Sequence, residues 1–108
     1  MKVFIVHAHP EPQSFTSAMK DAAVADFTAA GHEVVVSDLY AMNWNPVASP
    51  ADFGSRGNPE YFNYALEQRA SADANTLAAD IEAELVKLQA ADLVIFSFPL
   101  YWFSVPAI

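Results

Sequence analysis

The sequence predicts an α/β domain that is built on a parallel sheet. Three short, continuous apolar runs, at residues 3–6, 34–36 and 93–96, have the pattern of strands that are buried on both faces. Segments with helical character separate these runs. Such alternation is typical of a parallel sheet with right-handed crossovers and helices on both faces. By length, residues 1–108 are expected to form one domain.

The first predicted strand, Val3–Val6, leads into a loop that contains Pro10 and Pro12. Two prolines so close together exclude both a helix and regular strand pairing. Ser14 or Ser17 can then cap a helix, because serine is a preferred residue at this position.

This helix is expected to run to about Ala30. Its alanine-rich body has high helix propensity, and Met19, Val24 and Phe27 are predicted to face the core. Gly31 follows as the C-cap, where the backbone often turns left-handed and glycine is favoured.

The second predicted strand, residues 34–36, is followed by a long segment without periodicity, residues 41–72, which we call the arm. The arm holds three prolines, two glycines and five aromatic residues. Loops of this length inside a compact domain are generally functional, and disordered segments are poor in aromatic residues. We therefore favour an ordered arm that packs on another surface over a disordered insert.

Residues 76–90 are predicted to form an amphipathic helix, because apolar side chains recur at i, i+4, i+8 and i+11. These side chains are Leu77, Ile81, Leu85 and Leu88. The third strand, residues 93–96, would lie exposed at one edge of a sheet of only three strands. Because exposed apolar edges aggregate unless they are covered, we expect further chain to follow Ile108.

Composition narrows the classes of function. Thirteen acidic and five basic residues give a net charge of −8, which disfavours nucleic acid and anionic membrane surfaces as partners. The lack of cysteine excludes disulfides and thiol chemistry and is compatible with the cytoplasmic location that we expect. The apolar run at residues 93–108 is shorter than the ~20 residues of a membrane span and contains two prolines, so no membrane span is predicted.

The loop at residues 9–17 has two interpretations. Ser14, Thr16 and Ser17 stand at the start of a helix, where such residues are most often simple caps. They can also form a phosphate cradle, in which free N–H groups and the positive end of the helix hold the anion. No glycine-rich dinucleotide or phosphate-loop fingerprint is present, so the residues alone leave both interpretations open.

The titratable residues do not predict a metal site. His7 and His9 are close in sequence, but no cysteine or acidic cluster accompanies them, and metal sites usually need three or four ligands. Glu33 and Asp38 are interpreted as polar residues at strand ends rather than as an acid–base pair. No residue of the chain is assigned a catalytic role.

The segment at residues 98–106 places Tyr101, Trp102 and Phe103 directly after a strand. Three consecutive aromatic residues cannot all face one core, so at least one is expected to point elsewhere. A planar, electron-poor cofactor ring is a good stacking partner for such a face. Pro99 and Pro106 restrict the backbone on either side, so the N–H groups between them can be aimed at the polar edge of a ring.

Two segments carry a resemblance to a known family. They are SDLYAMN at residues 37–43 and ADLVIFSFPLYWFSVPAI at residues 91–108. Together with Ala8–His9 and Ser14–Phe15 in the first loop, they closely resemble the NAD(P)H:quinone oxidoreductases, in order and at matching spacing along the whole chain. The resemblance implies a flavodoxin-like fold with strand order 2-1-3, of which this chain would be the N-terminal portion.

The resemblance also implies FAD, rather than FMN, bound at a homodimer interface, with NAD(P)H as co-substrate and a quinone as small-molecule substrate. In the family's mechanism, hydride passes from nicotinamide to flavin and then to the quinone, and the cofactor supplies the chemistry. The family residues that assist this transfer lie outside these 108 residues, so Trp102 and Phe103 are expected to line the substrate site rather than to act as catalysts. The implied cofactor-binding residues are His9, Phe15, Thr16, Ser17, Ala18, Asn63, Pro99, Leu100, Tyr101, Trp102 and Phe103.

Some of these positions have specific implied roles. Thr16 stands where the best-known members carry Asn. Asn63 matches, across a gap of one residue, a Gln position that reaches the cofactor from the neighbouring subunit. Backbone N–H groups near Trp102 and Phe103 would meet the polar edge of the flavin ring.

Two other functions remain open at this point. A non-enzymatic regulatory or interaction subunit with the same fold would bind a flavin or nucleotide and a protein partner without turnover. A small FMN electron carrier is disfavoured, because the first loop lacks the tight Thr/Ser-Gly phosphate loop of flavodoxins.

Overall fold

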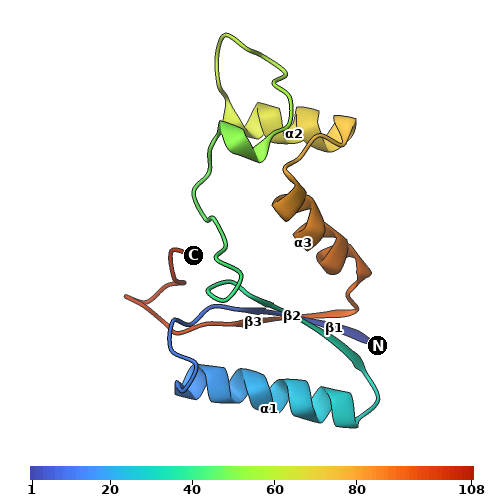
Figure 1. The fold of residues 1–108 in the computed structure, drawn as a ribbon, viewed down its shortest axis with the longest axis vertical. Helices are drawn as coiled ribbons and strands as arrows, with labels where there is room; N and C mark the ends of the chain where they lie inside the picture. The colour runs from blue at the N-terminus through green and yellow to red at the C-terminus, as the bar shows by residue number, and fades with distance from the viewer. The chain divides into compact units, whose positions relative to one another are not determined.

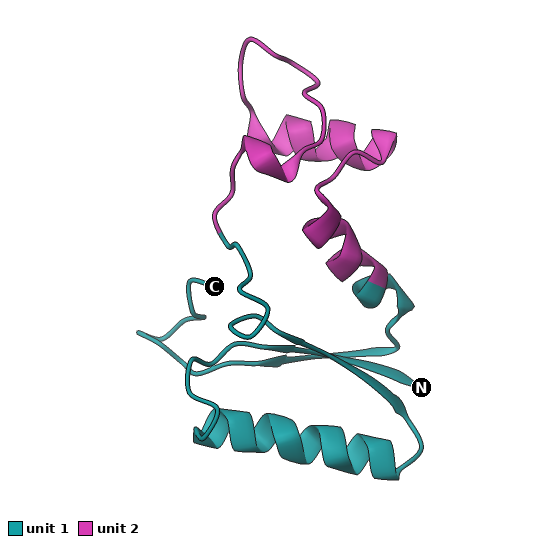
Figure 2. Cartoon of the chain, viewed as in Figure 1, with its two compact units in different colours: residues 1–46, 87–108 teal, residues 47–86 magenta.

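The computed structural model describes residues 1–108 and contains three strands, three α-helices and a short 3-10 helix (Figure 1). In chain order the elements are β1 (Lys2–His7), α1 (Phe15–Ala29), β2 (Glu33–Asp38), η1 (Pro50–Asp52), α2 (Tyr64–Ala74), α3 (Ala79–Ala90) and β3 (Leu93–Ser97). The chain forms two compact units, unit 1 at residues 1–46 and 87–108 and unit 2 at residues 47–86 (Figure 2). No helix has both the length and the apolar character that crossing a bilayer requires.

Unit 1 holds a parallel sheet in the order β2-β1-β3, which confirms the predicted fold class and strand order. β1 lies in the middle, with Val3 opposite both Val34 and Leu93, and Val3 and Ile5 are fully buried. The prediction that all three strands are buried on both faces is wrong for β2 and β3. Most of their side chains are half-buried, and Phe96 is 66% exposed, because each is an edge strand with only one neighbour.

α1 packs against the sheet of unit 1 (Figure 1). Ser14, one of the two predicted capping residues, is its N-cap and accepts a 3.0 Å hydrogen bond from the backbone N–H three residues later. After the helix, Gly31 takes a left-handed φ of +87°, the conformation for which glycine was expected. Val24 and Phe27 are half-buried, but Met19 is 57% exposed, contrary to the prediction. Met19 borders a shallow pocket beside the edge strand β3, where the helix is covered incompletely.

The arm contains η1 and α2, so its interpretation as one long loop is wrong. The buried side chains of α2 are Glu67 and Ser71, both polar, and the helix therefore has no apolar stripe for periodicity to detect. α2 is capped by Asn75, which adopts a left-handed φ of +56°. α3 begins at residue 79 rather than at residue 76, because Leu77 first pairs with Phe53 in an antiparallel bridge.

Aromatic side chains form the core of unit 2. Phe53 is buried, and its ring centroid lies 6.0 Å from that of Phe62 and 5.1 Å from that of Tyr64. Such ring pairs contribute about 0.5–1.5 kcal/mol each beyond their buried area. The Tyr64 hydroxyl donates a 2.6 Å hydrogen bond to Asp52, and this bond raises the pKa of Tyr64. Three of the five aromatic residues of the arm therefore pack on one another, whereas Tyr61 is exposed.

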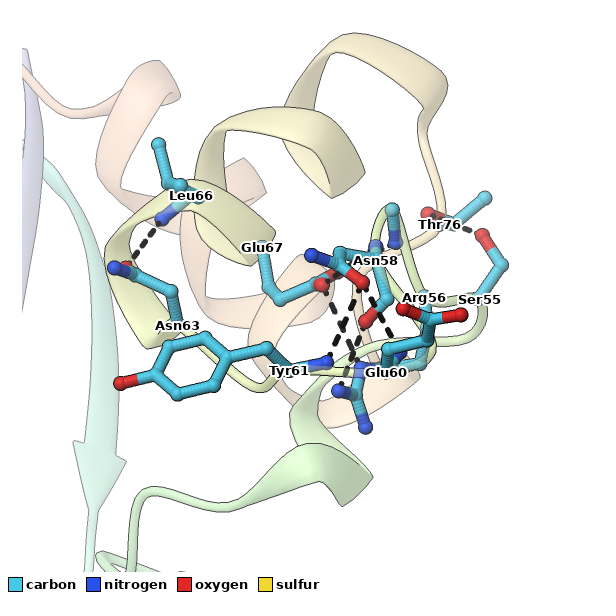
Figure 3. A network of polar contacts seen from close by, with 10 residues as sticks. Ser55, Arg56, Asn58, Glu60, Tyr61, Asn63, Leu66, Glu67 and Thr76 are labelled. Atoms are coloured by element: carbon cyan, nitrogen blue, oxygen red, sulfur yellow. Dashed lines mark hydrogen bonds and ion pairs between the residues drawn. The ribbon is translucent and has the colours of Figure 1, made fainter.

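A buried carboxylate organises the loop that precedes α2 (Figure 3). Glu67 is only 2% exposed, and its two oxygens accept hydrogen bonds from the backbone N–H groups of Gly57 at 2.7 Å and Asn58 at 3.0 Å. Arg56 Nε lies 3.5 Å from Glu67 Oε1, and the Arg56 guanidinium lies 4.8 Å from the centroid of the Phe62 ring. The N–H donors of Gly57 and then Asn58 hold the pKa of Glu67 below its ordinary value.

The substitution Glu67→Gln should destabilise unit 2, because glutamine offers one acceptor oxygen where the two N–H donors now bond to two. We expect a lower urea midpoint for this variant. The matched control is Glu60→Gln, an exposed side chain in the same loop, which should leave the midpoint unchanged. Equal loss in both variants would contradict the role of Glu67.

The amide proton shifts of Gly57 and Asn58 in the wild-type protein should titrate together, with a midpoint below the ordinary glutamate value of 4.5. The stabilisation by a carboxylate with a lowered pKa is present above its unfolded pKa and is lost as the pH falls through its folded pKa. NMR titration measures this midpoint. A midpoint at or above 4.5 would show that the N–H donors do not hold the charged form.

Candidate functional site

The carboxyl ends of the three strands meet at one edge of the sheet in unit 1. His7, the last residue of β1, stands opposite Asp38 at the end of β2 and Ser97 at the end of β3. The neighbours of β1 lie on opposite sides of it, so the strand order reverses here, which is the usual ligand position in open parallel sheets. The start of α1 and the segment after β3 lie at this same end of the sheet (Figure 1).

His7 connects these elements through its imidazole. The residue is 1% exposed, with Nδ1 3.0 Å from Ser97 Oγ and Nε2 3.2 Å from Ser17 Oγ. Burial lowers the pKa of His7 below its ordinary value of 6.5; Asp38 partly offsets this effect and Lys20 reinforces it. His7 is therefore a neutral, buried bridge between β3 and α1 at pH 7.

Residues 9–17, which comprise the loop between β1 and α1 and the first residues of the helix, are called the α1 loop and are held by their own hydrogen bonds. The Ser14 hydroxyl donates to Ser17 Oγ at 3.0 Å, and the Ser17 hydroxyl donates to the carbonyl oxygen of Glu11 at 3.0 Å. His9 Nδ1 accepts a 2.9 Å hydrogen bond from the backbone N–H of Glu11. The first turn of α1 holds no acidic residue. No carboxylate of that turn therefore neutralises the positive end of the helix dipole.

The predicted cofactor residues of this loop fall into two groups. Ser17 is buried, and the Ala18 N–H donates to the Ser14 carbonyl at 2.9 Å, so both are used within the protein. Phe15 and Thr16 carry the first N–H groups of the helix, which have no acceptor inside it. The Phe15 side chain is 80% exposed. The loop therefore presents two backbone donors in front of a serine network.

After β3 the chain forms a tight turn at residues 101–104, which we call the aromatic turn. Tyr101 and Ser104 exchange two backbone hydrogen bonds of 3.0 Å. Between them, Trp102 and Phe103 have φ values of +48° and +65°, a region that such turns normally fill with glycine or asparagine. Left-handed backbone costs other residues about 1–2 kcal/mol each. The turn holds Trp102 and Phe103 outward despite this strain, with exposures of 94% and 91%.

The rest of this segment borders an apolar groove in unit 1. Leu100 is 69% exposed, whereas Pro99 is half-buried. The groove has a volume of about 500 Å³. Its lining includes Val6, Ala8, Phe96, Phe98, Val105 and Ile108. A second pocket, of about 260 Å³, has both Thr16 and Phe98 in its wall, so the α1 loop and the segment after β3 border one space.

Asn63 is the one predicted site residue that belongs to unit 2. It caps α2, and its side-chain oxygen accepts a 3.2 Å hydrogen bond from the N–H of Leu66. Its proposed reach to the cofactor of a neighbouring subunit stays a prediction.

Two residues of this edge, His7 and Ser97, are not singled out as site residues by the sequence motifs. The signal that finds them is positional: each is a polar residue that directly follows an apolar run, in two strands predicted to be parallel. Parallel strands bring such residues to the same edge of a sheet. In the sequence, His7 and His9 were considered together and only as metal ligands. In the structure the two rings have different partners, Ser17 and the backbone N–H of Glu11.

Comparison with known proteins agrees with the fold described above. All residues, 1–108, match the family model of the flavodoxin-like fold. The human protein "Ribosyldihydronicotinamide dehydrogenase (quinone)" is 53% identical over 108 residues, which cover 99% of this chain and 47% of that protein. The Rattus norvegicus protein "NAD(P)H dehydrogenase (quinone) 1" is also 53% identical, with coverage of 99% and 39%.

Solved structures agree with these sequence matches. A structure from Klebsiella pneumoniae superimposes with a TM-score of 0.95 at 47% identity, covering 99% of this chain and 41% of that one. The NAD(P)H:quinone oxidoreductase from Methanothermobacter marburgensis has a TM-score of 0.77 at 29% identity, with coverage of 99% and 48%. The predicted resemblance is confirmed, and the chain spans less than half the length of these relatives.

Strain in the aromatic turn is testable by glycine substitution. Phe103→Gly removes the cost of left-handed backbone in the folded state, about 1–2 kcal/mol. Glycine also makes the unfolded chain more flexible, which lowers the free energy of unfolding by roughly 0.4–1 kcal/mol. We expect this variant to be at least as stable as the wild type in urea denaturation. Leu100→Gly, an exposed site in the same segment without a positive φ, should lose roughly 0.4–1 kcal/mol. A larger loss for Phe103→Gly than for Leu100→Gly would refute the strain.

Proposed function

We propose that this chain, which belongs to the family of proteins with the flavodoxin-like fold, provides part of the FAD site of an NAD(P)H:quinone oxidoreductase. The observation that supports this proposal most strongly is the shared edge in unit 1, where backbone donors of the α1 loop and the exposed rings of the aromatic turn follow neighbouring strands. The names of the relatives support the reaction class.

The α1 loop suits the phosphates of the cofactor. The chain carries a net charge of −8, so it must hold an anion with local donors rather than with a basic surface. The N–H groups of Phe15 and Thr16, at the positive end of a 15-residue helix, are such donors. Hydrogen bonds between Ser14 and Ser17 stabilise the conformation of this loop.

The aromatic turn suits the ring of the cofactor. Trp102 and Phe103 present aromatic side chains to solvent, and the apolar groove beside them is lined by carbon-rich residues. Only the outer residues of the turn pair with each other, so the N–H groups of Trp102 and Phe103 lie outside that pairing. Stacking surface and polar donors thus occur in the same short segment.

A bound flavin would supply the two-electron redox chemistry between NAD(P)H and a quinone. The protein residues bind and orient: Leu100, Tyr101, Trp102 and Phe103 cover the ring and exclude water, and no residue of the chain is assigned proton transfer. A homodimer, in which Asn63 reaches the flavin of the neighbouring subunit, and a cytoplasmic location complete the proposal.

The direct test is to add FAD or FMN to the purified protein and to follow flavin absorbance and fluorescence. Bound flavin with NAD(P)H-driven reduction of a quinone supports the full proposal. Flavin binding with a stable protein partner and no turnover, in the full-length protein as well, would favour the regulatory subunit instead. Absence of flavin binding in the full-length protein would refute the proposed site.

Phe103→Gly should also weaken FAD binding, because a ring contact of about 0.5–1.5 kcal/mol is lost. This corresponds to roughly a twofold to tenfold rise in Kd. Fluorescence titration measures the change. The matched control is Leu88→Ala, an exposed apolar side chain in the last turn of α3, which should leave Kd unaltered. Urea denaturation of Phe103→Gly, measured alongside, separates a lost ring contact from a loss of folding.

A further inference from the structure

One buried carboxylate in unit 2 organises the stretch of loop that leads to α2 (Figure 3). The two oxygens of Glu67 accept hydrogen bonds from the backbone N–H groups of Gly57 and Asn58. The side-chain oxygen of Asn58 in turn accepts from the N–H groups of Glu60 at 3.0 Å and Tyr61 at 3.3 Å. Each bond depends on the one before it, so the carboxylate supports the loop up to the residues that precede the helix.

Asn63 stands where this loop meets the helix, as the N-cap of α2. Its carbonyl oxygen accepts a 2.9 Å hydrogen bond from the N–H of Glu67, so the residue that supports the loop also closes the first turn of the helix. The rings on either side of Asn63, those of Phe62 and Tyr64, both pack on the buried ring of Phe53. The backbone of Asn63 is therefore held from both directions.

The cap also fixes which end of the Asn63 amide faces outward. The side-chain oxygen lies 3.2 Å from the backbone nitrogen of Leu66. A backbone N–H only donates, so the oxygen and not the NH2 group must face Leu66. The NH2 group makes no hydrogen bond within unit 2, and the residue is exposed. Asn63 thus presents a hydrogen-bond donor to a group outside this unit.

We propose that Glu67 is a positioning residue that holds Asn63 as a hydrogen-bond donor to the flavin cofactor of the neighbouring subunit. The proposal rests on the proposed function, which gives Asn63 its reach to that cofactor. Glu67 acts only through Asn63, because it is 2% exposed and both of its oxygens already accept from backbone N–H groups. The cofactor group that meets Asn63 must offer an acceptor oxygen or nitrogen.

The first experiment needs no flavin and tests whether Glu67 supports the cap. Amide hydrogen exchange is compared between the wild type and Glu67→Gln, in which one loop N–H loses its acceptor. The Leu66 amide should exchange about twofold to tenfold faster, the range that one net hydrogen bond represents. The Ser17 amide, which donates to the equivalent cap at Ser14 in α1, should keep its rate. Unchanged exchange at Leu66 would overturn the proposal.

The second experiment measures the Kd for FAD in the full-length protein, with circular dichroism to verify that each variant is folded. Asn63→Asp keeps the capping oxygen, and aspartate caps as well as asparagine, but the donor is lost. Its Kd should rise about twofold to tenfold. The matched control is Asn75→Asp, the same substitution at the other end of α2, where aspartate tolerates the left-handed backbone, and it should leave the Kd unchanged.

A double variant tests whether Glu67 acts through Asn63. Glu67→Gln alone should raise the Kd of the folded protein by a factor similar to that of Asn63→Asp. Because the two residues serve one contact, the losses should not multiply in the double variant. A merely structural role would lower the urea midpoint of Glu67→Gln and leave the Kd of its folded form at the wild-type value.

Asn58 offers a second route to the same contact if Glu67→Gln folds poorly. Asn58→Ala leaves the Glu67 carboxylate in place but removes the acceptor for the N–H groups of Glu60 and Tyr61. This variant should also weaken FAD binding. Asn58→Asp retains an acceptor oxygen and should restore the wild-type Kd; equal Kd values for wild type and Asn58→Ala would contradict the proposal.

The outcomes separate the two proposals. If FAD binds and the losses of Glu67→Gln and Asn63→Asp multiply, Glu67 acts independently of Asn63, and its positioning role is refuted while the flavin site stands. If Asn63→Asp binds FAD as tightly as wild type, Asn63 does not contact the cofactor and the positioning role is refuted as well. If the wild type binds no FAD, the proposed function fails, whereas the exchange rate of Leu66 still reports whether Glu67 supports the cap.

Discussion

The candidate site depends on one constraint, the in-register parallel pairing of β1 between β2 and β3. This pairing aligns His7 with Asp38 and Ser97, so residues that are 90 positions apart in sequence share a hydrogen bond. Burial of Val3 and Ile5 in the central strand supplies the driving force. A slip of one residue would turn His7 to the opposite face of the sheet and would separate the α1 loop from the segment after β3.

Unit 1 departs from ordinary packing at the points that would meet a ligand. Its edge strands are half-exposed, its most prominent aromatic residues face solvent, and Trp102 and Phe103 adopt left-handed backbone. Departures of this kind tend to cluster at functional sites, where the surrounding structure maintains them. In unit 2, by contrast, Phe53, Phe62 and Tyr64 pack together, and the buried carboxylate of Glu67 accepts hydrogen bonds from two backbone donors.

Elements whose structure depends on local chemistry could be predicted from the sequence. Apolar runs predicted the three strands, the serines at positions 14 and 17 predicted the start of α1, and Gly31 predicted its end. α2 was not predictable from periodicity, because the helix buries Glu67 and Ser71 rather than an apolar stripe. The cofactor-binding segments were named by resemblance, but the bridge through His7 could not be, since it depends on which strands become neighbours and on the shared edge that this pairing creates.

The central claim is that the α1 loop and the aromatic turn form one flavin site. It is tested most directly by following backbone amide signals of the isotope-labelled protein during an FAD titration. The account predicts that the amides of Phe15 and Thr16 and those of Trp102 and Phe103 shift together, with a single common Kd. Shifts confined to one of the two segments, or two separate affinities, would contradict it.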